Sequence, residues 1–107
     1  MTVAQLTALE LKNKIQDTAN LFLLDVREPN EFQYASIDSS VLIPLNQISQ
    51  RIGELDKNLE IVVICHHGMR SQQAAHFLAQ SGFNQVANLI GGIEAWSCVC
   101  DSSVPRY

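Results

Sequence analysis

The segment IVVICHHGMRSQQAA (residues 61–75) predicts a strand, a turn and the start of a helix in one uninterrupted pattern. Its first four residues are β-branched and apolar without polar alternation, which is typical of a parallel strand buried on both faces. Cys65 ends this run, and a polar turn with Gly68 follows. The helix predicted after the turn ends near Gly82, a residue suited to a left-handed cap. The apolar positions on its inner side are Ala74, Ala75, Phe77 and Leu78.

The same alternation of strand and helix patterns extends along the rest of the chain. Strands are predicted at residues 3–6, 21–26, 40–44, 61–64 and 85–90. Further helices are predicted after the capping-box pair Thr7 and Glu10, from Pro29, across 45–55, and after Gly91-Gly92. This order predicts an α/β fold: a doubly wound, mainly parallel five-stranded sheet with helices on both faces. We expect a single domain over residues 1–107, with 97–107 as an irregular C-terminal tail.

The length, composition and charge of the chain limit the classes of protein to which it can belong. The chain has 107 residues, of which 47% are hydrophobic, and a formal net charge of −4. This suits one globular domain with a modest core. The acidic balance and the absence of a basic run argue against nucleic acid as a partner. Apolar runs are too short for a membrane span, the start does not resemble a signal peptide, and three cysteines do not suit a disulfide scaffold. We therefore expect a cytoplasmic location and no membrane partner.

The residues that follow Cys65 suit the stabilisation of an anion. Ligands of open α/β sheets bind outside the carboxyl ends of the strands, where Cys65 is predicted to lie. The next helix presents free N–H groups, and Gly68 permits a turn in which successive amides point inward. Arg70 adds a permanent positive charge, and Ser71 is predicted to cap the helix. Together these features favour a nucleophilic Cys65 thiolate; the alternative is an inert buried thiol.

Three motifs occur in a characteristic order. They are LLDVREPNEF (23–32) followed by LIPLNQI (42–48), the loop CHHGMRS (65–71) of the form Cys-x-x-Gly-x-Arg-Ser, and NLIGGIEAW (88–96). Over nearly its whole length the chain resembles a single-domain rhodanese, a sulfurtransferase. The resemblance implies that Cys65 takes sulfur from a donor such as thiosulfate or a persulfide. The Cys65 persulfide then passes this sulfur to a thiol or to cyanide. It also implies a role for the loop around the persulfide sulfur, with Arg70 holding loop and donor; the loop residues are His66, His67, Gly68, Met69, Arg70 and Ser71.

Other interpretations of the loop remain open at this point. One is a non-catalytic persulfide carrier or binding module, which would exchange sulfur with a protein donor or acceptor. Another is an oxyanion reductase or phosphatase of the same fold. Phosphatases have Cys-x5-Arg, whereas Cys65 and Arg70 enclose four residues, and we identify no general acid. Loops that accept thiosulfate well often carry cationic side chains where this one has His66 and His67, so a persulfide donor is at least as good a prediction.

Asp25 and Arg27 follow the end of a predicted strand and form the supporting part of the predicted site. The alternative role is structural, with Arg27 paired to Glu31, or Asp25 bound to a loop amide or to Arg70. We favour the structural role, with Asp25 fixing the loop.

The remaining features carry weaker predictions. Adjacent histidines rarely converge on one ion, so we expect no metal and no cofactor. Cys98 and Cys100 are poorly spaced for a disulfide and are expected to be incidental, unless one of them resolves the persulfide. Family members commonly have Gly-Ala where this chain has Ser39-Ser40 and Gly-His-Ile where it has Ala35-Ser36-Ile37. The oligomeric state stays open.

Overall fold

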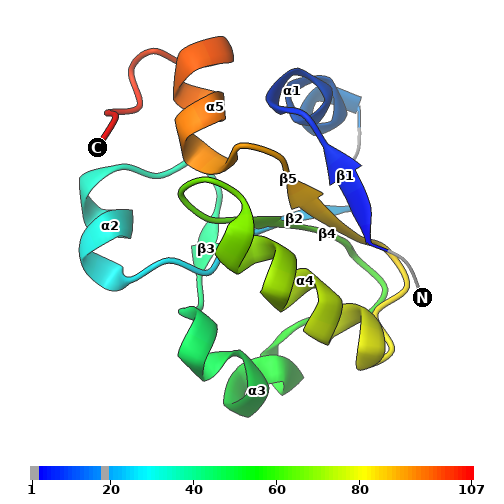
Figure 1. The fold of residues 1–107 in the computed structure, drawn as a ribbon. Helices are drawn as coiled ribbons and strands as arrows, with labels where there is room; N and C mark the ends of the chain where they lie inside the picture. The colour runs from blue at the N-terminus through cyan, green and yellow to red at the C-terminus, as the bar shows by residue number, and fades with distance from the viewer. Residues whose placement is uncertain (1–2, 18–19) are drawn as a thin grey trace.

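The computed structural model describes residues 3–17 and 20–107. Five strands form one parallel sheet in the order β1-β5-β4-β2-β3 (Figure 1). In chain order the strands are β1 (Ala4–Leu6), β2 (Leu21–Asp25), β3 (Val41–Leu42), β4 (Glu60–Ile64) and β5 (Val86–Leu89). Strand β4 pairs with β2 in a register that sets Ile64 beside Asp25. The segments that follow these two strands therefore leave the sheet side by side.

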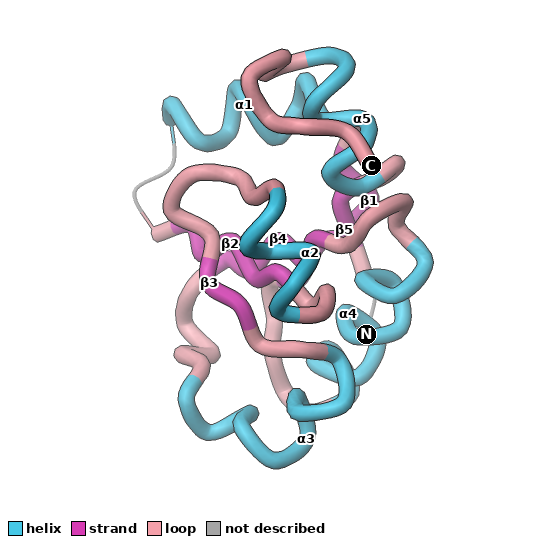
Figure 2. The backbone as a smooth tube through the Cα atoms, turned by 90° about the vertical axis from the view of Figure 1, so that its left-hand side faces the viewer, coloured by secondary structure: helices cyan, strands magenta, loops and turns pink. Residues whose placement is uncertain are grey.

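Helices cover both faces of this sheet, as predicted. They are α1 (Ala8–Asp17), α2 (Pro29–Tyr34), α3 (Ile48–Arg51), α4 (Met69–Gln80) and α5 (Gly92–Val99). Helices α3 and α4 lie on one face, and α1 and α5 lie on the other (Figure 1). Helix α2 follows β2 and lies in front of the sheet in the view of Figure 2. The doubly wound α/β fold expected from the sequence is confirmed.

Strand β4 shows why an unbroken apolar run is needed at the centre of the sheet. Ile61 and Val63 pack in the core cluster beneath α3 and α4, whereas Val62 and Ile64 pack in the cluster beneath α1 and α5. All four are at most 1% exposed. Because successive side chains of a strand face opposite sides, burial on both faces removes the need for polar alternation.

Two elements are less regular than predicted. Strand β3 is only two residues long and lies at the edge of the sheet, although the Ile43 and Leu45 N–H groups still donate to the Asp25 and Val26 carbonyls at 2.9 and 3.0 Å. Pro44 lies between them, where its missing N–H would face away from β2, as is tolerated in an edge strand. The segment 45–55 packs its apolar positions on the core as expected, but it is not one α-helix. Short 3₁₀ turns (Leu45–Gln47 and Ile52–Glu54) flank α3. Gly53 in the second turn has a low helix propensity, which disfavours a continuous helix.

The end of the chain is more ordered than an irregular tail. Helix α5 continues to Val99, within the segment expected to be irregular. Beyond it, Val104 is buried in the second core cluster, and the Ser97 hydroxyl donates to its carbonyl at 2.5 Å. This packing directs the last residues back toward the sheet end that carries Cys65. No helix in the described part of the chain has the length and apolar character needed to cross a bilayer.

Candidate active site

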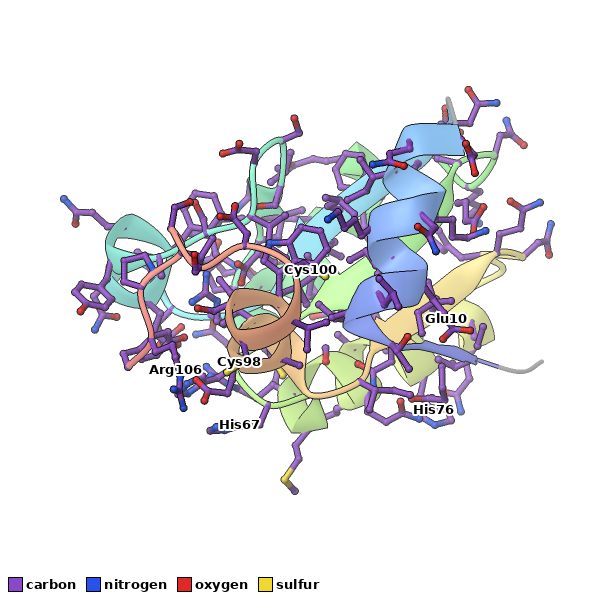
Figure 3. The ribbon with its side chains drawn as sticks, turned by 90° about the horizontal axis from the view of Figure 1, so that it is seen from above. Glu10, His67, His76, Cys98, Cys100 and Arg106 are labelled. Atoms are coloured by element: carbon purple, nitrogen blue, oxygen red, sulfur yellow. The ribbon has the colours of Figure 1, made fainter. Side chains whose placement is uncertain are left out.

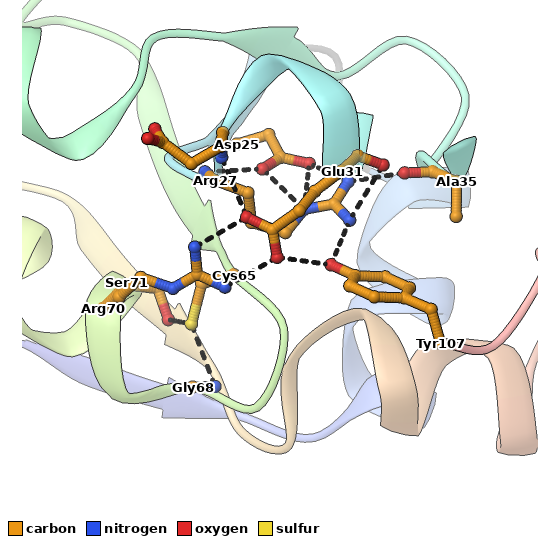
Figure 4. Close-up of polar contacts among 10 residues, drawn as sticks. Asp25, Arg27, Glu31, Ala35, Cys65, Gly68, Arg70, Ser71 and Tyr107 are labelled. Carbon is orange, nitrogen blue, oxygen red and sulfur yellow. Dashed lines mark hydrogen bonds and ion pairs between the residues drawn. The ribbon is translucent and has the colours of Figure 1, made fainter. Parts of the chain in front are cut away.

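Cys65 directly follows β4 and is 1% exposed. After the cysteine the chain reverses through Gly68, whose φ of 106° lies in the left-handed region that favours glycine. The Gly68 N–H donates to the Cys65 Sγ at 3.0 Å (Figure 4). Gly68 also precedes the first residue of α4, so the thiol lies against the amide-rich end of that helix. Strand end, reversed turn and helix start therefore all act on one sulfur atom.

Ser71 touches this sulfur as well, but not in the predicted way. The sequence predicts Ser71 as the cap of α4, whereas Gly68 occupies the cap position and the helix begins at Met69. Ser71 is instead buried in the first turn, with its Oγ 3.2 Å from the Cys65 Sγ. Its hydroxyl donates to the side chain of Asn88 on β5. Because a serine has one hydroxyl proton, it can donate either to Asn88 or to a Cys65 thiolate.

The first turn of α5 holds the loop from one side through backbone contacts. The N–H of Ile93 donates to the Cys65 carbonyl at 2.8 Å, and the N–H of Glu94 donates to the His66 carbonyl at 3.2 Å. A Cβ on Gly92 would lie 2.3 Å from the His66 oxygen and 2.4 Å from the Cys65 oxygen, so this approach requires glycine. In a trans peptide the N–H points opposite to the preceding carbonyl. The loop amides that follow these two carbonyls therefore point away from α5.

Arg70 does not stand alone as a positive charge, because α2 supplies it with a carboxylate. Its two terminal nitrogens donate to Glu31 at 2.7 and 2.9 Å in a bidentate pair (Figure 4). This guanidinium lowers the pKa of Glu31 to about 2. Glu31 in turn raises the pKa of Arg70, and the charge of Cys65 contributes in the same direction. Sequence reasoning missed this pair, because Arg70 and Glu31 are 39 positions apart and no local pattern relates them.

Asp25 and Arg27 pair with each other, and both side chains are fully buried. The guanidinium donates to the carboxylate at 2.6 Å, and the Arg27 backbone N–H binds the same group at 3.0 Å. The suggested pairings of Asp25 with Arg70 and of Arg27 with the Glu31 side chain are wrong. Arg27 instead binds backbone, donating to the carbonyls of Ala35 at 2.6 Å and Glu31 at 3.4 Å. The pair thus fixes the segment from β2 to the end of α2.

Tyr107 is a part of the site that no sequence pattern indicated. Its hydroxyl accepts from Arg27 at 2.6 Å and donates to Glu31 at 2.9 Å, and burial raises its pKa. The ring stacks on His66 with centroids 3.9 Å apart, and His66 stacks on His67 at the same separation. Burial lowers the pKa of His66, with His67 acting in the same direction. His66 therefore adds no positive charge near neutral pH.

The other predicted site residues lie at the edge of the loop or outside it. His67 is exposed, and Met69 is 84% exposed. Figure 3 places Cys98 and His67 toward the same side of the molecule; the Cys98 Sγ is 3.9 Å from a Glu94 carboxylate oxygen. Cys100 is half-buried against the second core cluster, and burial raises its pKa. All three cysteines are free thiols. Across residues 3–17 and 20–107, no cluster of His, Cys, Asp and Glu is arranged to hold a metal ion.

Comparison with known proteins assigns the family. The rhodanese-like domain pattern matches residues 7–98. A protein of Allochromatium vinosum named sulfurtransferase is 35% identical over 95 residues, covering 89% of each chain. The "Putative sulfur carrier protein YrkF" of Bacillus subtilis is 36% identical over 96 residues, but this chain spans only about half (52%) of its length.

The solved structures agree with this assignment. The crystal structure of a rhodanese-like domain protein from Staphylococcus aureus superposes with a TM-score of 0.84 at 28% identity, covering 98% of this chain and 99% of that one. The parallel sheet with its covering helices is thus that of a known class of structures. The chain belongs to the rhodanese-like family.

Proposed function

We propose that this protein transfers sulfane sulfur through a persulfide on Cys65. The donor is thiosulfate or a persulfide, and the acceptor is a thiol or cyanide. The observation that carries the proposal is the Gly68 N–H, 3.0 Å from a sulfur that lies at the start of α4. Relatives named sulfurtransferase and sulfur carrier protein support the same chemistry. Three free thiols suit a reducing compartment, and we place the reaction in the cytoplasm.

In the first step the Cys65 thiolate attacks the outer sulfur of the donor. A bond forms between Sγ and that sulfur, the donor's own bond to it breaks, and the electron pair leaves with sulfite or with a thiolate. The loop stabilises the negative charge before and after the attack. Gly68 donates its N–H, and Ser71 turns its hydroxyl from Asn88 to the sulfur. In the second step the acceptor attacks the outer sulfur and the electron pair returns to Sγ.

The other predicted residues act around this centre. Arg70, held by Glu31, keeps the loop in place and faces the donor. Asp25 and Arg27 support the loop indirectly, because their buried pair fixes α2 and with it Glu31. His66, His67 and Met69 border the sulfur with backbone amides rather than with charge. Since Glu31 offsets the Arg70 charge and His66 is neutral, a dianion such as thiosulfate is attracted weakly. We therefore favour a persulfide as the better donor.

A second candidate function is a persulfide carrier that does not turn over with small molecules. It is supported by the carrier name of one relative and by the fully buried thiol. A protein partner can contribute contacts that a small acceptor lacks. Turnover with cyanide or a small thiol separates the two: an enzyme discharges repeatedly, whereas a carrier stays loaded until its protein partner is added.

The first test is the intact mass of the reduced protein after exposure to thiosulfate and, separately, to a small persulfide. We expect wild-type protein to gain one sulfur atom, and dithiothreitol or cyanide to remove it. Cys65→Ser stays unchanged, and Cys98→Ser, which keeps Cys65, behaves as wild type. Oxidation to the sulfinic acid adds nearly the same mass but is not reversed by thiols, so reversal distinguishes the two.

The outcomes separate the donors. Loading by thiosulfate establishes the thiosulfate reaction, and loading by the persulfide alone assigns the protein to transfer between persulfides. If neither reagent loads Cys65, or if Cys65→Ser loads as well as wild type does, the proposal is wrong.

A further inference from the structure

Three side-chain amides continue the hydrogen bonding of Cys65 toward the surface, and the proposed chemistry does not yet use them. The Ser71 hydroxyl, 3.2 Å from the Cys65 Sγ, donates to the side-chain oxygen of Asn88. The Asn88 nitrogen donates to the Gln5 oxygen at 3.1 Å, and the Gln5 nitrogen donates to the Gln72 oxygen at 2.7 Å. We call Asn88, Gln5 and Gln72 the amide network. It connects to the reactive sulfur through a single hydroxyl group.

The fold brings these side chains together from three elements. The parallel register pairs Gln5 of β1 with Asn88 of β5, so both side chains lie on the sheet face that α4 covers. On α4, Gln72 lies one turn from His76, and the Gln72 nitrogen is 2.9 Å from the His76 Nε2. Asn88 is 4% exposed, whereas Gln5 and His76 are exposed (Figure 3). The amide network therefore runs from the core to the solvent.

All three amides point in the same direction. Each oxygen accepts from the neighbour nearer to Cys65, and each nitrogen faces the neighbour nearer to the surface. An amide group keeps its shape when its oxygen and nitrogen exchange places. Turning all three amides over therefore gives a second complete set of hydrogen bonds in which every donor points inward. His76 serves both sets, because its Nε2 accepts in one tautomer and donates in the other.

The two sets differ in where they leave the proton of Ser71. In the outward set the Asn88 oxygen accepts this proton, as the structure has it. In the inward set the Asn88 nitrogen donates to the Ser71 oxygen, and the hydroxyl proton is left to the sulfur 3.2 Å away. Hydrogen bonds to a charged group favour its charged form. The inward set therefore stabilises the Cys65 thiolate, and the outward set does not.

We propose that Asn88 and Gln5 are positioning residues for the sulfur transfer: through the direction of the amide network they decide whether the Ser71 hydroxyl binds the Cys65 sulfur. This inference rests on the proposed function and deepens it. When Cys65 ionises, its proton leaves to solvent, the three amides turn inward, and the hydroxyl proton stays on the Ser71 oxygen. Attack on the donor starts from this state.

The test measures how fast iodoacetamide alkylates Cys65 at different pH values, by the mass of the peptide that contains it. The rate of persulfide loading is measured beside it. In Gln5→Glu the carboxylate can only accept, so it keeps the Asn88 nitrogen outward and the Ser71 proton on the Asn88 oxygen. We expect the midpoint of the alkylation profile to rise by about 0.5 pH unit. Loading below the midpoint should slow about threefold.

Asn88→Leu should move the midpoint the other way. Leucine has a similar size but no acceptor, so the sulfur no longer competes with Asn88 for the Ser71 proton. We expect the midpoint to fall by about 0.5 pH unit. A change that merely loosened the site would not produce opposite shifts in the two variants. Asn88 is buried, so a thermal unfolding curve verifies that this variant folds, whereas Gln5→Glu changes only an exposed residue.

Two controls separate hydrogen bonding from the added charge. Ala4→Glu places the same charge on the neighbouring exposed residue of β1, whose side chain faces the other side of the sheet. It should leave the midpoint unchanged. The double variant of Gln5→Glu with Asn88→Leu should have the midpoint of Asn88→Leu alone, because Gln5 acts only through Asn88.

Failure of this inference and failure of the proposed function give different results. If Ala4→Glu shifts the midpoint as much as Gln5→Glu does, or if the double variant keeps the Gln5→Glu shift, charge rather than the amide network acts on Cys65. A midpoint that rises in Asn88→Leu overturns the inference as well. In each case sulfur transfer stands if the wild-type protein loads. If the wild-type protein gains no sulfur, the proposed function is wrong and this inference is wrong with it.

Discussion

The loop that carries Cys65 is held on two sides by different means. On the α5 side, backbone binds backbone: N–H groups of the first helical turn donate to the Cys65 and His66 carbonyls, and Gly92 leaves no room for a side chain. On the α2 side, charged side chains form a continuous series of contacts. The series runs from Arg70 through Glu31 and Tyr107 to Arg27 and Asp25.

The two sides differ in how much each of their contacts contributes to the stability of the fold. On the α5 side, Gly92 and the carbonyl groups of the loop are already in van der Waals contact. An added side-chain atom at Gly92 therefore breaks this contact completely rather than weakening it. The side-chain series is graded, because its inner end is fully buried and its outer end is partly exposed: Asp25 and Arg27 are 0% exposed, whereas Arg70 is 36% exposed. Breaking a buried ion pair costs far more than breaking an exposed one. We therefore expect the loss in the free energy of unfolding on substitution to decrease along the series from Asp25 to Arg70.

The inner end should give the largest effect. Asp25→Asn keeps the shape of the side chain but leaves the Arg27 guanidinium buried without its counter-charge. We expect the free energy of unfolding to fall by about 4 kcal/mol, measured by urea denaturation at neutral pH. Glu54→Gln, which breaks an exposed pair with Arg51, is the control and should have no measurable effect. A loss below about 1 kcal/mol for Asp25→Asn would contradict the graded series.

The α5 side should give the next largest effect. Gly92→Ala places a Cβ 2.3 Å from the His66 oxygen at a residue whose φ is 61°. We expect a destabilisation of about 3 kcal/mol from overpacking and backbone strain, and a loss of Cys65 loading because the loop must move. Gly53→Ala is the matched control, since a Cβ there meets nothing within 4 Å. Loading at the wild-type rate in Gly92→Ala would mean that the α5 contacts do not shape the loop.

The partly exposed pair should have a smaller effect that depends on pH. Glu31→Gln removes the charge that Arg70 binds, and we expect a loss of about 1 kcal/mol at pH 7. Arg70 lowers the pKa of Glu31 from an ordinary 4.5 to about 2, so the stabilisation is complete above pH 4.5 and is lost as the pH falls through 2. The free energies of unfolding of wild-type protein and of Glu31→Gln should therefore converge as the pH falls through 2. A difference that persists unchanged at that pH would assign the effect to packing rather than to charge.

The contrast between local backbone contacts and contacts of distant side chains also explains how much of the site could be predicted from the sequence. The strand, turn and helix around Cys65 were predictable because their signals are local: a β-branched run, Gly68, and apolar residues at helical spacing. The Gly91-Gly92 turn was predictable for the same reason. Arg70 and Glu31 are 39 positions apart and Tyr107 and Glu31 are 76 apart, and no periodicity relates them.

One error has a physical cause. Ser71 has the residue type of a helix cap, but the left-handed conformation of Gly68 starts α4 earlier, and the serine hydroxyl turns inward. The backbone geometry of the neighbouring turn, rather than the residue's own preference, decides the role of this serine.

Tyr107 should give the smallest effect on stability and the most informative one on the site. Tyr107→Phe loses the hydroxyl that bridges Arg27 and Glu31 but keeps the ring on His66, and we expect a loss of about 0.5 kcal/mol. Tyr107→Ala removes the ring as well. Because burial lowers the pKa of His66, uncovering the imidazole should raise that pKa toward its ordinary value of 6.5. An NMR titration of His66 should therefore respond to Tyr107→Ala and not to Tyr107→Phe. Equal responses would mean that the hydroxyl, rather than the stacked ring, determines the charge of the histidine that borders the reactive sulfur.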